Sequence, residues 1–154
     1  MIDFLKSKTD FDKVEEIVFD KLFINSGLNY LGKHKQKIRK ESASEFISYE
    51  FKSKKNDLVH INCEKYIFKN YDDYFDITNN TIKALNIKEF REGIYYLVNL
   101  SKLKDGSNEG YKKLSSFIFR LDPKLDTESS NKFLFSEKLN NLINLEIDKL
   151  ISAL

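Results

Sequence analysis

Two stretches, FISYEFK at residues 46–52 and LVHINCEKYIFK at residues 58–69, decide how this chain folds. In both, apolar side chains recur at every second position, which is the period of a β-strand with one buried face. The polar residues between them, SKKND at 53–57, have the length and composition of a hairpin turn. The sequence therefore predicts an antiparallel hairpin as the basis of a sheet.

Amphipathic helices are predicted at both ends of the chain. Residues 10–26 carry apolar side chains at three- and four-residue steps, with Thr9 or Asp10 as the cap and Gly27 where the helix would stop. A second stripe of this kind follows Ser136, a good N-cap residue. Both patterns predict helices that bury one face.

The middle of the chain is also predicted to be helical. A short helix is expected over 78–85 and another over 87–102, although Gly93 costs the second about 1 kcal/mol relative to alanine. Alternation then indicates strands at 115–121 and 132–135.

Length and composition fit a single domain. A chain of 154 residues buries roughly 68–70% of its unfolded surface without disulfides or a structural metal. Hydrophobic residues make up 41% and charged residues 32%, which is a globular rather than a disordered composition. We predict one compact α+β domain over residues 1–154, with an antiparallel, hairpin-based sheet packed against N-terminal, central and C-terminal amphipathic helices.

Cysteine content and hydropathy indicate the cellular compartment of the protein. The single cysteine, Cys63, excludes an internal disulfide and a multi-cysteine zinc site. No apolar run approaches the ~20 residues of a membrane span, and the N-terminus has no signal-peptide run. The sequence predicts a cytoplasmic protein that needs no membrane and no cofactor.

Familiar catalytic motifs are missing from the sequence. The five glycines form neither a phosphate loop nor a dinucleotide fingerprint, and there is no GxSxG elbow. On the second strand His60 and Cys63 would point to opposite faces, which is poor geometry for a Cys–His pair. We expect Cys63 in the core and His60 half-exposed, and predict a protein that is not an enzyme.

YDDYFD at residues 71–76, here called the acidic–aromatic segment, has three interpretations. Aspartates favour the start of a helix, where they cap free N–H groups and offset the dipole. Aromatics beside carboxylates also suit the binding of a basic partner. The spacing does not fit a calcium loop, so no metal site is predicted. The candidate partner-binding residues are Tyr71, Asp72, Asp73, Tyr74, Asp76 and His60.

The run KHKQKIRK at residues 33–40 is the most basic part of the chain. On a strand, alternate lysines would form a row that could follow phosphates, but no aromatic side chains are interleaved for base stacking. The formal net charge is only +2, which is low for a nucleic-acid-binding domain. A solvated surface is the simpler interpretation. The candidate phosphate-binding residues are Lys33, Lys35, Lys37, Arg39 and Lys40.

Charge is unevenly distributed along the chain. Residues 33–55 carry eight positive and three negative charges, whereas residues 57–80 carry two positive and five negative charges. Such polarity suits encounter with a charged partner. With the lysine-rich composition typical of an AT-rich accessory locus, it favours a non-catalytic inhibitor or immunity-type protein that masks a toxin or effector. The alternatives are a nucleic-acid-binding or regulatory module using residues 33–40 and an enzyme with a scattered site.

Overall fold

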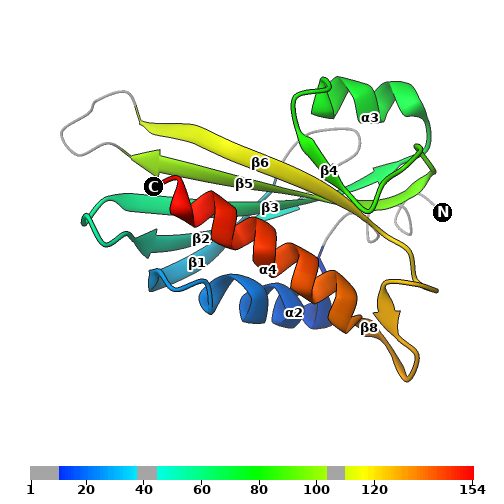
Figure 1. Cartoon of the computed structure of the whole chain (residues 1–154), viewed down its shortest axis with the longest axis horizontal. Coiled ribbons are helices and arrows are strands. Elements are labelled where there is room, and N and C mark those ends of the chain that lie inside the picture. Colours follow the sequence, from blue (N-terminus) through cyan, green and yellow to red (C-terminus); the bar gives the residue numbers. More distant parts are fainter. Residues whose placement is uncertain (1–10, 38–44, 104–109) are drawn as a thin grey trace.

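The computed structural model describes residues 11–37, 45–103 and 110–154, which form a mixed α/β fold (Figure 1). In these residues one six-stranded sheet has the order β1–β2–β3–β5–β6–β4, and a small sheet pairs β7 with β8. Among the strand pairs of the large sheet that the structure describes, only β4–β6 is parallel. The strands are β1 (Asn29–Lys37), β2 (Glu45–Lys52), β3 (Leu58–Phe68), β4 (Lys83–Leu85), β5 (Gly93–Leu103), β6 (Tyr111–Leu121), β7 (Thr127–Glu128) and β8 (Asn131–Phe135). The helices are α2 (Lys13–Ile24), α3 (Tyr71–Thr78) and α4 (Glu137–Ser152).

The predicted hairpin is present. Strands β2 and β3 are antiparallel and in register from the pair Phe46–Glu64 to the pair Lys52–Leu58. Strand β3 then pairs along its whole length with β5, so the hairpin lies inside the sheet rather than at its edge. The strands expected at 115–121 and 132–135 are also confirmed, within β6 and β8.

Helices α2 and α4 cover one face of the large sheet (Figure 1). A capping box starts α2, because the Asp12 carboxylate accepts a hydrogen bond from the Glu15 backbone at 2.7 Å and Glu15 reciprocates. Ser136 caps α4 as predicted, accepting from the Leu139 backbone N–H at 3.2 Å. Thr9 and Asp10, the caps expected for the first helix, lie outside the described residues.

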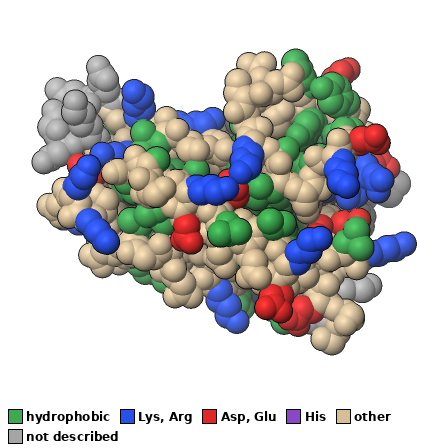
Figure 2. Space-filling view, viewed as in Figure 1, with side chains coloured by type: hydrophobic (Ala, Val, Ile, Leu, Met, Phe, Trp, Pro, Cys, Tyr) green, Lys and Arg blue, Asp and Glu red, His purple; other side chains and the backbone are tan. Residues whose placement is uncertain are grey.

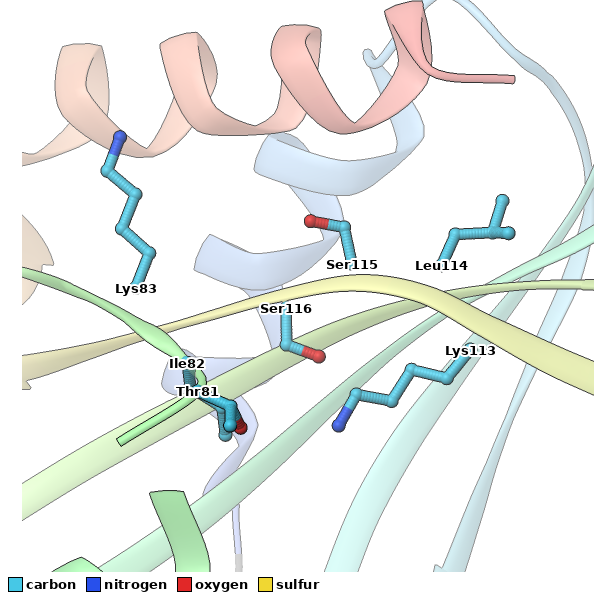
Figure 3. A pocket seen from close by; sticks show the side chains of 7 residues that line it. All are labelled: Thr81, Ile82, Lys83, Lys113, Leu114, Ser115 and Ser116. Atoms are coloured by element: carbon cyan, nitrogen blue, oxygen red, sulfur yellow. The ribbon is translucent and has the colours of Figure 1, made fainter. Parts of the chain in front are cut away.

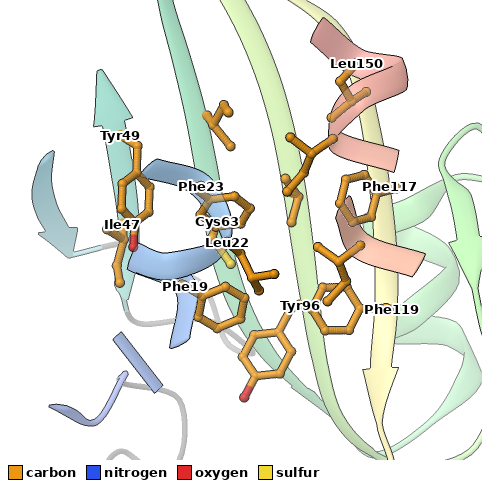
Figure 4. Close-up of a cluster of buried hydrophobic side chains, with 14 of the residues drawn as sticks. Phe19, Leu22, Phe23, Ile47, Tyr49, Cys63, Tyr96, Phe117, Phe119 and Leu150 are labelled. Atoms are coloured by element: carbon orange, nitrogen blue, oxygen red, sulfur yellow. The ribbon is translucent and has the colours of Figure 1, made fainter. Parts of the chain in front are cut away.

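The main core lies between this helical pair and the sheet. Figure 4 shows Phe19 and Phe23, the two aromatic side chains of α2, lying against Tyr49, Cys63 and Tyr96 of the strands. Phe19 and Phe23 are fully buried. Full burial of one such side chain contributes about 1.5–3 kcal/mol, so this layer is the main source of stability.

A second, smaller core occupies the opposite face of the sheet. Its buried members, Tyr66, Phe68, Tyr95, Leu97 and Ile118, alternate along the strands with residues of the main core. Helix α3 and the segment before β5 cover this cluster through partly buried Tyr74, Ile77 and Phe90. The candidate acidic–aromatic segment therefore lies on the face that α2 and α4 leave open.

The central helices predicted after Thr78 are wrong. Residues 83–85 form β4, and 93–103 form the long central strand β5. Strand β5 is buried on both faces, so its apolar residues form a continuous run in which period two is invisible. Gly93 begins β5 with a φ of 149°, a conformation that side chains with a Cβ rarely adopt. Gly93 is therefore the first residue of a strand and not a destabilising residue inside a helix.

Among the helices of the described residues, none has the length and apolar character to span a membrane.

Candidate partner-binding surface

The acidic–aromatic segment forms most of α3. Asn70 caps the helix by accepting a hydrogen bond from the Asp73 backbone N–H at 2.9 Å. Asp72 and Asp73 occupy the first turn, where negative charge offsets the helix dipole. Asn79 ends the helix in the left-handed conformation, with a φ of 48°. The interpretation of the segment as a helix start is confirmed, but the capping side chain is that of Asn70 and not of an aspartate.

One side of α3 anchors it to the sheet. The Tyr74 ring lies 5.8 Å from Phe68, 5.5 Å from Phe90 and 5.4 Å from Tyr95, measured between ring centroids. Burial raises the pKa of the Tyr74 hydroxyl, with smaller contributions from Tyr95 and Tyr71. Tyr74, a candidate contact residue in the sequence, is therefore mainly a packing residue beneath the helix.

The other side of α3 faces solvent. Asp72 and Asp76 are exposed. Tyr71 lies at the border between the two sides: it is 51% exposed, and its ring centroid is 5.9 Å from that of Phe75 and 6.1 Å from that of Phe90. Asp73 is half-buried and accepts a hydrogen bond from the Asn70 side chain at 3.1 Å. No ion pair to these aspartates is found in the described parts of the chain. Figure 2 shows acidic and hydrophobic side chains together over α3.

His60, the remaining candidate, lies far from α3. It precedes Phe68 by eight residues on β3, a separation of about 26 Å at the rise of a strand. Its Nε2 is 3.2 Å from Glu50 Oε1, and its ring stacks on Tyr111 with centroids 3.9 Å apart. The structure thus does not bring His60 and the acidic–aromatic segment into one site.

A histidine cluster, defined as His34, Glu50, His60 and Tyr111, forms instead from β1, β2, β3 and β6. The two imidazole rings are 6.3 Å apart. Burial lowers the pKa of His60, Glu50 opposes this effect, and the nearby His34 adds to it, so His60 favours the neutral form. Sequence reasoning missed this cluster because it depends on the pairing of β1 with β2, which no local pattern specified.

Residues 33–40 do not present a free row of cations in the described part of the chain. Lys33 Nζ lies 2.8 Å from Glu16 Oε1 and 2.7 Å from Asp20 Oδ2 of α2. Lys35 Nζ lies 2.8 Å from Glu16 Oε2. Burial acts to raise the pKa of Glu16, but the two lysines outweigh it and hold that pKa below its ordinary value. These lysines tie β1 to α2.

The structure gives no side-chain description of the other candidate phosphate-binding residues. Lys37 is the last residue of β1, and Arg39 and Lys40 lie outside the described residues. Cys63 is fully buried in the main core, as the sequence predicts. Burial raises the pKa of its thiol well above the ordinary value, which makes it a poor nucleophile.

Metal ligands do not gather in the described residues: 11–37, 45–103 and 110–154 contain no group of three or more His, Cys, Asp or Glu side chains that could hold an ion.

Comparison with known proteins gives no relative from which a function could be carried over: no protein family, no curated protein and no solved structure matches the chain significantly.

Proposed function

We propose that this chain is a non-catalytic, cytoplasmic protein-binding domain of the inhibitor or immunity type, which uses the outer side of α3 to mask a basic surface of a toxin or effector. The observation that carries the proposal is the combination of exposed Asp72, Asp76 and Tyr71 on a helix that Tyr74 fixes to the sheet.

Two physical features support this use of α3. From Asn70 to Ile82 the chain has three aspartates and no lysine or arginine, so the local charge is not neutralised within the segment. Carboxylates of this kind accelerate encounter with a basic partner and pair with its Lys or Arg side chains. The half-exposed Tyr71 ring supplies apolar contact area of the sort found at binding hot spots.

The proposal is tested by capture and neutralisation together. The tagged chain is used to capture partners from its host after nuclease treatment, and a bound protein is then co-expressed with the chain in a toxicity assay. We expect one stoichiometric partner with a basic surface, whose toxicity the wild-type chain suppresses. The triple variant Asp72→Asn/Asp73→Asn/Asp76→Asn should lose both capture and suppression.

A matched control distinguishes loss of the α3 site from a general change in the net charge of the protein. Glu128→Gln/Glu137→Gln/Asp148→Asn removes three exposed carboxylates from outside α3, so it should retain binding. Asparagine keeps polar character at the start of α3, and circular dichroism of the triple variant checks that the fold is intact. Equal loss in both variants, or recovery of nucleic acid instead of protein, would contradict the proposal.

A further inference from the structure

Strand β6 has an outer edge that is only partly covered. Strand β4 pairs with Phe117, Ile118 and Phe119 and with no residue before them. On the opposite side β5 pairs with β6 along most of its length. In the described residues, Tyr111–Ser116 therefore have no strand on their outer side. We call residues 111–116 the outer edge of β6.

A hollow marks the point where this coverage ends. It has a volume of about 380 Å³. Its lining comes from residues 81–83, the last of which begins β4, and from residues 113–116 of β6. Figure 3 shows Lys83 and Ser115 directed toward α4, with Lys113 and Ser116 on the other side of the sheet. An extended segment placed along the outer edge would continue the line of β4 and end in this hollow.

The side chains along the edge are basic and partly apolar. Lys112 and Lys113 are exposed, and no ion pair to either is found in the part of the chain that the structure describes. A β-bulge makes Leu114 an extra residue opposite β5, and its side chain is 40% exposed. The edge thus offers backbone groups, positive charge and one apolar contact.

We infer that the outer edge of β6 binds an extended, acidic segment of a partner protein as an additional strand. Main-chain hydrogen bonds to an uncovered edge give such binding its affinity, and flanking side chains select the sequence. Pairing of this edge with a second copy of the chain is disfavoured, because it would bring the lysine pairs of two copies together. This inference goes beyond the proposed function, since α3 would bind basic groups and this edge acidic ones.

The first experiment uses a capped peptide in which glutamate alternates with threonine, added to the isotope-labelled full chain at low salt. We expect backbone amide shifts concentrated at residues 111–116 and 81–83, and affinity that falls with added salt. Lys112→Glu/Lys113→Glu should weaken binding at least tenfold. Both variants are compared at about 0.15 M salt, where the Debye length is about 8 Å. The control Lys13→Glu/Lys138→Glu, an equal charge change at two exposed helix-start lysines, should then leave affinity within about twofold because surface charges far apart are screened.

A second pair of peptides tests the strand geometry. N-methyl groups on alternate residues block one edge of an extended peptide, and two such peptides block opposite edges. A peptide that adds to β6 uses one edge only, so one methylated form should lose binding and the other should retain it.

Three results would overturn the inference. Equal affinity of both methylated peptides would indicate charge attraction without strand addition. Absence of shifts at 111–116 up to millimolar peptide would mean that the lysines only guard the edge against aggregation. Concentration-dependent shifts at 111–116 without peptide would identify a second copy of the chain as the occupant.

Discussion

Replacing Lys65 by methionine should destabilise the fold strongly, because it leaves a buried carboxylate without its cation. Lys65 is 5% exposed and its Nζ lies 2.7 Å from Oε1 of Glu15, which is 9% exposed. The hydroxyl of fully buried Tyr96 donates to the other Glu15 oxygen. Methionine keeps most of the lysine stem, so the main loss is electrostatic. Removing one member of a buried pair costs about 3–5 kcal/mol.

The assay is urea unfolding at pH 7.5 of wild type, Lys65→Met and Lys65→Met/Glu15→Gln. The double variant should recover part of the loss at pH 7.5. A loss below about 1 kcal/mol for the single variant would refute the argument, since exposed pairs contribute that little.

Three further outcomes are expected. Tyr49→Phe removes a 2.8 Å hydrogen bond from a buried hydroxyl to the Asp20 carboxylate and should cost about 1.5–3 kcal/mol in thermal or urea unfolding. Because the pKa of His60 is lowered in the folded state, the unfolded chain binds more protons near that pKa. The free energy of unfolding should therefore fall as the pH drops below the ordinary histidine pKa of about 6.5. His60→Gln should reduce this dependence on pH. Cys63 should resist a thiol reagent such as DTNB in the native state and react fully in denaturant; fast native reaction would contradict its burial.

The parts of the fold that could be predicted are those with one buried face. The hairpin of β2 and β3 and the two terminal helices show their period directly, because polar residues alternate or form a stripe opposite the apolar ones. Strand β5 shows no such alternation of polar and apolar residues, because Tyr95 packs on one face of the sheet and Tyr96 on the other. A run buried on both sides carries no periodicity, so its position beside β3 is set by tertiary pairing.

The candidate site was predictable only as a local element. The helix-start character of residues 71–76 follows from their side chains, and the exposed aspartates follow from the helix. The packing of Tyr74 against the sheet, and the distance between α3 and His60, depend on how β3 pairs within the sheet. The ion pairs of Lys33 with α2 depend on which face of β1 meets that helix, and a charge count in the sequence holds no such information.

The main core is formed by segments that lie far apart in the sequence and are therefore synthesised at different times. Helix α2 emerges before any strand of the sheet on which it packs, and α4, whose Ile143 and Ile147 help to close the same core, emerges after all of them. Without α4, the part of the main core that Ile143, Ile147 and Leu150 complete would lack its cover. The main core therefore cannot be completed before α4, the last element of the described chain, has been synthesised.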